Sequence, residues 1–350
     1  MSRMRQAGLI NQVWVRCLLA SSPLLNIMAG AQPDTPDARI TNGLVHATVQ
    51  IPDRSPSAYR GTRFDHSGIV TGLQYAGHEF IGKWHEVTDP TIHDAVTGPA
   101  EEFLTGDSAW GYEDTRPGDE FPRIGVGGVR KPTGESAYRR YGLYEIVDPG
   151  KWDVKAHKDR VEFKQTFKLP SSGYGYVYRK VVGLNPGKPE LDVYHSLKNT
   201  GSKPLDTSQY SHNFFAMDHQ VVGPDVTVRF AFTPMASHDM KYGARVEDHA
   251  IVYTRELEDK QAASADITGF GNGTRDYDIQ VQNARLGTEV RIQGDRPLER
   301  MYFWSIRTVA CPEHYVHLSI RPGEETHWTI RYEFAAGTSA KPSAGKYNSP

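Results

Sequence analysis

The sequence predicts an all-β fold, a large antiparallel β-sandwich. Three observations favour it: short segments in which apolar and polar residues alternate, turn signals between these segments, and the lack of a convincing amphipathic helix longer than two turns. Alternation with a period of two residues is typical of strands that bury one face. Strands separated by turns at such spacing indicate a sandwich or a barrel rather than βαβ units.

The alternating segments recur through most of the chain. They occupy residues 47–51, 159–167, 191–197, 226–232, 290–293 and 328–334. Turn signals lie between them at Pro149-Gly150, Asn185-Pro186-Gly187, Asn199-Thr200-Gly201 and Pro322-Gly323. Residues 239–248 are the best candidate for a helix, and their pattern is weak. The sequence therefore predicts one sandwich domain over residues 39–335.

The start of the chain resembles an export signal. Three arginines without an acidic residue precede a short apolar stretch, and Ala29-Gly30-Ala31 has the pattern of a cleavage site. We expect residues 1–31 to be a signal peptide cleaved after Ala31, which predicts a periplasmic or secreted protein; the alternative is a disordered tail. Residues 32–38 then form a linker, and the composition of residues 336–350 predicts a disordered tail.

Charge and composition limit the choice of partner. The formal net charge of −2 over 350 residues argues against nucleic acid or a membrane surface as the main partner. Aromatic residues make up 11% of the chain, which gives faint support to sugar binding by ring stacking. The sequence contains no H-E-x-x-H motif, cysteine cluster or calcium loop, so we expect no metal and no cofactor. The oligomeric state is left open.

Residues 64–130 differ from the rest of the chain. They are rich in glycine, histidine, acidic and aromatic residues and show little alternation. Long irregular stretches inside a compact domain tend to be functional loops. We therefore expect Trp110, Tyr112 and Arg116 to border a binding cleft. The glycine-rich stretch 124–128 has no helix after it, which predicts a bulged or closely approached strand rather than a phosphate loop.

Two motifs could carry acid–base chemistry. His212 lies in Tyr210-Ser211-His212-Asn213-Phe214-Phe215, and a histidine can transfer protons near neutral pH. Glu313 follows an apolar strand and a proline, where partial burial would suit a general base. From residue types alone, a structural histidine and an exposed glutamate at a strand end remain the alternatives.

In this order, the two motifs resemble those of the aldose 1-epimerase, or galactose mutarotase-like, superfamily. The turn 199–205 and His212 are similar to the strand–turn–strand that leads to that family's histidine. Residues 276–304 resemble the segment that holds its sugar-binding aspartate, and Cys311-Pro312-Glu313 resembles the place of its base. Arg321-Pro322-Gly323-Glu324 is similar to its closing turn. The resemblance covers about residues 40–335 and implies a large antiparallel sandwich.

The resemblance also implies a mechanism and a set of sugar contacts. Glu313 would remove the proton of the anomeric hydroxyl, and His212 would protonate the ring oxygen. Asp278 and Arg63 would hold sugar hydroxyls. The family's first active-site histidine is missing, because the matching place holds Arg139-Arg140-Tyr141-Gly142. Arg140 could act in its stead.

The sequence therefore predicts a carbohydrate-active protein that interconverts the anomers of a monosaccharide or oligosaccharide, an isomerase. Two alternatives stay open because the fold also serves other functions. One is a polysaccharide lyase or glycoside-cleaving enzyme on the same fold. The other is a carbohydrate-binding domain without catalytic activity.

Overall fold

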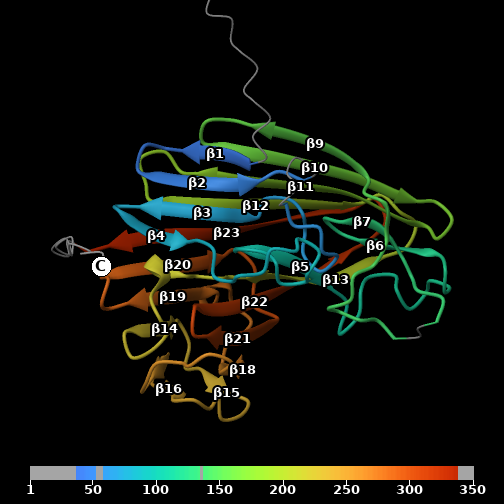
Figure 1. The fold of residues 1–350 in the computed structure, drawn as a ribbon. Coiled ribbons are helices and arrows are strands. Elements are labelled where there is room, and N and C mark those ends of the chain that lie inside the picture. Colours follow the sequence, from blue (N-terminus) through green and yellow to red (C-terminus); the bar gives the residue numbers. More distant parts are fainter. Residues whose placement is uncertain (1–36, 53–57, 135–136, 338–350) are drawn as a thin grey trace, which may run out of the picture. The chain divides into compact units, whose positions relative to one another are not determined.

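The computed structural model describes residues 37–52, 58–134 and 137–337. These residues form antiparallel sheets, which confirms the predicted β-sandwich (Figure 1). They all belong to the second of two compact units, residues 35–350. The predicted signal peptide and most of the predicted linker and C-terminal tail lie outside the described residues; residues 37 and 38 of the linker begin β1 (Asp37–Thr41). Within the described part of the chain, no helix is long and apolar enough to span a membrane.

The largest sheet has ten strands and curves through the molecule (Figure 1). Its strands pair in antiparallel fashion from β16 at one edge to β9 at the other. In spatial order they are β16 (Ala244–Glu247), β17 (Ala250–Tyr253), β14 (Val226–Phe230), β19 (Asp278–Asn283), β20 (Thr288–Gly294), β23 (Glu325–Ala336), β12 (Glu190–Asn199), β11 (Tyr174–Leu184), β10 (Arg160–Leu169) and β9 (Lys151–Ala156).

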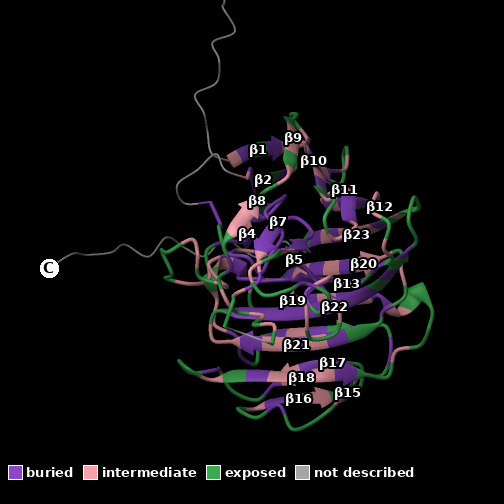
Figure 2. Cartoon of the chain, turned by 90° about the vertical axis from the view of Figure 1, so that its right-hand side faces the viewer, coloured by how far each residue is buried: buried purple, intermediate pink, exposed green. Residues whose placement is uncertain are grey.

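A second sheet of six strands carries most of the residues discussed below. In spatial order its strands are β15 (Met235–Ala236), β18 (Ala262–Thr268), β21 (Arg300–Ile306), β22 (Val309–Ile320), β13 (Leu205–His212) and β5 (Ala100–Leu104). Both faces of β22 are covered over its first eight residues, so its burial does not alternate there (Figure 2). One face contacts the core, and the other lies under loops.

Two smaller sheets and two short turns of 3-10 helix complete the described structure. The four-stranded sheet contains β1 (Asp37–Thr41), β2 (Val45–Gln50), β3 (Val70–Tyr75) and β4 (His78–Ile81). The three-stranded sheet contains β6 (Glu120–Arg123), β7 (Gly127–Arg130) and β8 (Ile146–Asp148). The 3-10 turns are η1 (Met217–His219) and η2 (Thr274–Asp276).

All six alternating segments of the sequence coincide with strands over most of their length, β2, β10, β12, β14, β20 and β23. Their burial alternates as expected, for example along β10, because each packs one face on the core. The weak helix candidate at residues 239–248 is wrong. Lys241, Tyr242 and Gly243 all have positive φ and form a turn, and β16 follows it. The region 64–130 is also less irregular than expected, since it contains β3 to β7.

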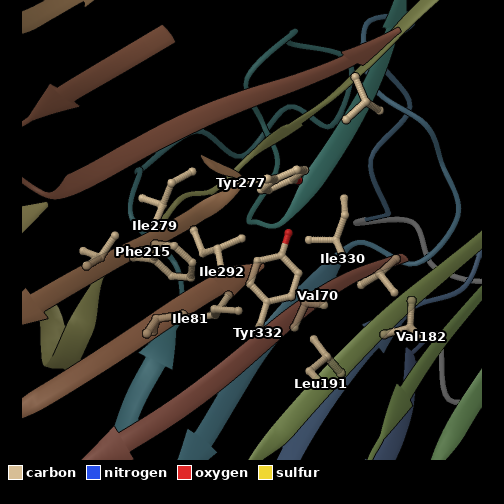
Figure 3. Packing of buried hydrophobic residues seen from close by; sticks show 14 of the residues in the cluster. Val70, Ile81, Val182, Leu191, Phe215, Tyr277, Ile279, Ile292, Ile330 and Tyr332 are labelled. Atoms are coloured by element: carbon tan, nitrogen blue, oxygen red, sulfur yellow. The ribbon is translucent and has the colours of Figure 1, made fainter. Parts of the chain in front are cut away.

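The main hydrophobic core lies against the large sheet (Figure 3). Ile330 and Tyr332 of β23 lie beside Leu191 of β12 and Ile292 of β20, and Val70 and Ile81 approach from the four-stranded sheet. Each of these side chains is almost completely buried. Burying an aliphatic side chain of this size contributes roughly 1.5–3 kcal/mol to folding. The core therefore fixes the sheets as one scaffold for the cleft.

A charged cluster lies on the core face of the six-stranded sheet. Lys180 of β11 contacts Glu101 at 2.7 Å and Asp65 at 3.2 Å. His195 of β12 lies 2.9 Å from the Glu101 carboxylate, and all four side chains are buried. Gly125 permits this packing, because a Cβ there would lie 2.4 Å from Asp65. The expected close approach of the chain in the stretch 124–128 is thus observed, but at the turn between β6 and β7 rather than within a strand.

Candidate functional site

A cleft of about 420 Å³ opens on the other face of the six-stranded sheet. Strands β13, β18, β21 and β22 form its floor, and the loops before β3, β5 and β8 contribute its walls. The lining side chains are mostly charged or aromatic. They are Arg63, Asp94, Arg140, Tyr141, His212, Ala262, Ser264, Arg300, Tyr302, Trp304, Glu313 and Tyr315.

The pairing of the strands explains how these residues meet. Alternate residues of a strand share a face, so Glu313 and Tyr315 of β22 both point to the cleft. His212 is the last residue of β13 and lies directly opposite Glu313. Tyr302 of β21 lies opposite Glu313 on its other side. Residues directly opposite in neighbouring strands have Cβ atoms about 5 Å apart, so the three side chains form one row.

His212 and Glu313 are in contact. The Nε2 atom of His212 lies 3.2 Å from Oε1 of Glu313, and both side chains are more than nine-tenths buried. The ring of His212 is held by Phe214, stacked at 4.0 Å between centroids, and by Trp304, edge-on at 5.8 Å. At Gly98, a Cβ would lie 2.5 Å from the carbonyl oxygen of His212, so only glycine allows this approach. The two side chains lie on the same side of the cleft.

Burial and nearby charges shift both groups away from their usual behaviour. Burial raises the pKa of Glu313 to about 7, although Arg63 and Arg140 act in the opposite direction. Burial, followed by the charges of Arg63 and Arg140, lowers the pKa of His212 well below its ordinary value. Near neutral pH the histidine is therefore neutral, and Glu313 is close to its titration point. The titrating proton of this pair therefore resides on Glu313.

Cys311 is the third member of this chain of contacts. Its sulfur lies 2.6 Å from Nδ1 of His212, and burial raises the pKa of the thiol well above its ordinary value. The three residues offer potential metal ligands within 4.8 Å of one another. The two ring nitrogens of His212 face different partners, however, so they do not converge on one point. The contacts fit a hydrogen-bonded chain better than a coordination site.

Glu102 anchors the arginines beside this pair. It is fully buried on β5, and its Oε2 accepts hydrogen bonds from Arg63 at 3.1 Å, Arg140 at 3.2 Å and Tyr210 at 2.6 Å. Arg123 approaches its other oxygen at 3.4 Å. Burial alone would raise the pKa of Glu102, but the three arginines outweigh it and lower the pKa. Glu102 therefore stays ionised and holds the guanidinium groups in place.

The structure brings four of the predicted site residues together. His212, Glu313, Arg63 and Arg140 all line the cleft. Arg63 also forms an ion pair with Asp94 and donates to the hydroxyl of Tyr210 at 3.0 Å. Arg140 donates to the same hydroxyl at 2.6 Å. The arginine that stands where the resemblance leads one to expect a histidine therefore faces the same cleft as His212.

Asp278 does not reach the cleft. It lies on β19 of the ten-stranded sheet, and its carboxylate accepts two hydrogen bonds from Arg291, at 2.8 and 2.6 Å. Gln293 donates a third hydrogen bond at 3.1 Å. Asp278 is thus a partner of its neighbouring strand β20. The expectation that it holds a sugar hydroxyl is corrected.

The three loop residues expected at the cleft border are also elsewhere. Trp110 is buried in the main core, against Tyr174, and donates to the carbonyl of Pro204 at 3.1 Å. Tyr112 is completely buried in a small separate cluster, where it packs on Phe121. Arg116 is exposed and does not line the cleft. Aromatic residues in this region serve packing, which composition alone could not distinguish from sugar stacking.

Several cleft residues were not singled out from the sequence. Arg300, Tyr302 and Trp304 alternate along β21, and Tyr315 follows Glu313 at the same spacing. This alternation is a signal that the sequence contained, because it places polar and aromatic side chains on one face of adjacent strands. Asp94 and Tyr141 carried no such signal, since their positions depend on loops, and neither did Glu102 behind the cleft, which lies on a strand buried on both faces.

No protein-family model matches the chain, and no curated protein matches it in sequence. Solved structures do resemble it. A candidate aldose 1-epimerase from Escherichia coli K12 is 10% identical, with a TM-score of 0.54, over 86% of this chain and 99% of that one. A galactose mutarotase-like protein from Clostridium acetobutylicum is 14% identical, with a TM-score of 0.51, over 85% and 95%.

A galactose mutarotase related enzyme from Lactobacillus acidophilus gives a similar result, with 13% identity and a TM-score of 0.50 over 85% of this chain and 97% of that one. Each of these proteins aligns over nearly its whole length. At such identities the likeness concerns the fold and not the activity. The described chain therefore has the galactose mutarotase-like β-sandwich fold.

Proposed function

We propose that this protein binds a free sugar in the cleft and interconverts its anomers by acid–base catalysis. The observation that carries the proposal is the buried contact between His212 and Glu313, 3.2 Å apart at the floor of the cleft. A pair of adjacent groups with strongly shifted pKa values is typical of catalytic acid–base sites. The aromatic side chains of Tyr302 and Trp304 offer faces on which a pyranose ring can pack.

The reaction requires one group to accept a proton while another donates one. A base takes the proton of the anomeric hydroxyl, and the pair of electrons left on that oxygen forms the C1=O bond. The bond from C1 to the ring oxygen breaks, and an acid protonates the ring oxygen. Rotation about C1–C2 and the reverse steps then give the other anomer. The two oxygens are both bonded to C1, so two adjacent protein groups can serve them together.

The pKa shifts of Glu313 and His212 indicate which of them acts as the acid and which as the base. The resemblance implied Glu313 as the base and His212 as the acid. A raised pKa of Glu313 and a lowered pKa of His212 favour the opposite distribution in the resting cleft. Glu313 then donates its proton to the ring oxygen, and neutral His212 accepts the anomeric proton. Ring closure reverses both transfers, so the pair returns to its starting state.

The contact with Cys311 supports this arrangement. A neutral His212 can place its ring proton on Nδ1, facing the Cys311 sulfur, and leave Nε2 free to accept a proton. Protonated Glu313 can then donate to Nε2 when no substrate intervenes. Cys311 would act as a positioning residue, because its contact selects the nitrogen that faces the cleft.

A second candidate function is the cleavage of an acidic polysaccharide by elimination. Arg140, Arg300 and Tyr315 favour it, because they put cations and a phenol at the same cleft. Elimination next to a carboxylate needs a cation that neutralises the acid group and a base that removes the neighbouring proton. The two candidates differ in product, since elimination leaves an unsaturated end and epimerisation leaves the bonds of the chain intact.

A panel of free sugars and polysaccharides tests both functions. We expect polarimetry to detect anomer interconversion faster than the spontaneous rate for at least one free sugar. We expect no new reducing ends and no ultraviolet absorbance of unsaturated products from any polymer. Unsaturated products without anomer interconversion would instead establish the lyase, and binding with neither activity would leave a carbohydrate-binding protein.

A further inference from the structure

The cleft carries more cationic than anionic groups. Three arginines line it, Arg63, Arg140 and Arg300, whereas its carboxylates are Asp94 and Glu313. Glu313 is only partly ionised near neutral pH, since burial raises its pKa to about 7. Neutral sugars need acceptors as well as donors for their hydroxyl groups, and arginine supplies donors only. Glu102 and Asp266 pair with these arginines, so the attraction for an anion depends on the guanidinium edges that remain unpaired.

Not all three arginines are available to a ligand. Arg63 is buried, and it is engaged by Glu102, Asp94 and the Tyr210 hydroxyl. It is best regarded as a part of the wall. Arg140 uses Nε and Nη2 for Glu102 and Tyr210, and a quarter of its side chain remains exposed. Within the described residues, no carboxylate hydrogen-bonds to its Nη1.

Arg300 lies on β21, at the floor of the cleft. It is nearly half exposed and bonds to Asp266 through Nε alone, at 2.7 Å. In the described part of the chain, its two terminal nitrogens have no carboxylate partner. The two outward edges of a guanidinium group match the geometry of a carboxylate or a phosphate. Arg300 thus presents a free binding edge to a ligand in the cleft.

Two stacked phenol rings connect Arg140 and Arg300. Tyr210 and Tyr315 stack at 4.4 Å between centroids. The Cζ atom of Arg140 lies 5.2 Å from the Tyr210 ring, and that of Arg300 lies 5.2 Å from the Tyr315 ring. Strand pairing puts Tyr210 opposite Tyr315 and Tyr315 opposite Arg300. The two guanidinium groups are close enough for their charges to repel each other, and a bound anion would relieve this repulsion.

This cationic pair lines the same cleft as the acid–base pair. Tyr315 and Glu313 are two residues apart on β22, on the same face of the strand. A sugar with its anomeric centre at His212 and Glu313 would therefore extend toward the part of the cleft that Arg140 and Arg300 line.

We infer that the sugar bound in this cleft carries an anionic group, held between Arg140 and Arg300, with a uronate as the simplest example. The inference rests on the proposed sugar site but not on its catalytic activity. The sugar ring packs on Tyr302 and Trp304 at the floor of the cleft, and the anion replaces water around the two guanidinium groups. A phosphate or sulfate on the same carbon would bind to the guanidinium groups in the same way. The test therefore includes a phosphate sugar as well as carboxylate sugars.

Binding of matched sugars tests this inference by isothermal titration of the whole protein. The pairs are glucuronate with glucose, galacturonate with galactose and mannuronate with mannose, and glucose 6-phosphate is a further probe. We expect at least one anionic sugar to bind about tenfold or more tightly than its neutral partner, and less tightly as salt is raised. Preference for the phosphate would identify the phosphate as the anion and still support the inference.

Two variants and a control make the result specific. Arg300→Gln removes a half-exposed side chain, so the protein should fold, and the anionic sugar should lose about tenfold or more in affinity. Arg140→Gln should do the same, and circular dichroism checks its folding. Arg116→Gln removes an exposed arginine outside the cleft and should leave binding unchanged.

The inference is overturned if neutral sugars bind as tightly as every anionic partner, if no sugar binds, or if Arg300→Gln keeps full affinity for the anion. Its failure differs from that of the proposed function. Tight binding of an anionic sugar without anomer interconversion would reject the proposed catalysis alone. Interconversion of neutral sugars without any preference for anions would reject this inference alone.

Discussion

At the scale of single residues, environment decides what His212 and Glu313 can do. Both are common residue types, and on a surface neither would differ from dozens of others. Strand pairing puts them 3.2 Å apart. Burial raises the pKa of Glu313 and lowers the pKa of His212, so it favours the neutral form of each side chain. The sequence identified both residues through their motifs. It could not show that they touch, because the contact depends on the register between β13 and β22.

The raised pKa of Glu313 predicts a pH-dependent stability. A carboxyl group whose pKa rises on folding, here from 4.5 to about 7, holds its proton more tightly in the folded state. The wild-type protein therefore loses stability as pH rises between these two values. Glu313→Gln removes this loss. Its free energy of unfolding relative to wild type should rise by about 3 kcal/mol between pH 4.5 and pH 8.

Urea unfolding of both proteins across this pH range measures the difference, and titrating groups that do not contact Glu313 cancel in the comparison. A difference between the two proteins that stays constant with pH would show that Glu313 titrates as an ordinary exposed glutamate. The cleft would then lack the poised acid on which the proposed mechanism relies.

At the scale of elements, alternation along strands separates two functions of one sheet. On β5, Glu101 points to the core and contacts Lys180, whereas its neighbour Glu102 points to the opposite face and binds the arginines beside the cleft. The sequence shows only two adjacent acidic residues in a stretch without clear pattern. Because β5 is buried on both faces, polarity does not alternate with burial there, and the strand was missed.

The core-facing cluster predicts a large loss of stability when its cation is removed. Lys180→Met would leave Asp65 and Glu101 buried with one compensating charge fewer. Breaking a buried ion pair in this way costs about 3–5 kcal/mol. Lys203→Met is the matched control, since Lys203 pairs with Asp114 at the surface and should cost about 1 kcal/mol or less. Equal effects of the two variants in urea unfolding would refute the structural role of the cluster.

The sequence placed Trp110 and Tyr112 at the border of the binding cleft, whereas their packing predicts that they stabilise the fold and do not contact the sugar. Each should lower the free energy of unfolding by about 3–5 kcal/mol when replaced by alanine, as buried aromatic residues do. Neither change should alter sugar affinity in protein that remains folded. Arg116→Ala should affect neither quantity. Unfolding by urea and sugar titration measure the two effects, and weaker binding at unchanged stability would restore these residues to the cleft.

At the scale of the whole molecule, the fold was accessible from sequence and the cleft only in part. Alternating segments sufficed for strands such as β10 and β23, because each buries one face. Loops that converge from distant parts of the sequence, such as those with Asp94 and Tyr141, left no periodic signal. The resemblance supplied His212, Glu313, Arg63 and Arg140 for the cleft, and it misplaced Asp278, which pairs within β19 and β20.

Export of the protein stays a prediction, since residues 1–31 lie outside the described part of the chain. The basic start, the apolar stretch and Ala29-Gly30-Ala31 predict cleavage after Ala31. Mass spectrometry of the protein from its native host should find Gln32 at the N-terminus. An intact Met1 in a cytosolic fraction would contradict the prediction.

The central claim is that His212 and Glu313 exchange protons with a sugar at its anomeric centre. The most direct test is the rate of anomer exchange, measured by nuclear magnetic resonance on a sugar shown to bind. His212→Asn and Glu313→Gln keep the size of each side chain and remove its proton transfer, and Asp278→Asn is a matched control outside the cleft. Loss of one acid–base group typically costs about 10²–10⁴-fold in rate. We predict this loss in both cleft variants, with sugar binding retained, and none in the control. Exchange no faster than the spontaneous rate in the wild-type protein, or full activity in either cleft variant, would contradict the account.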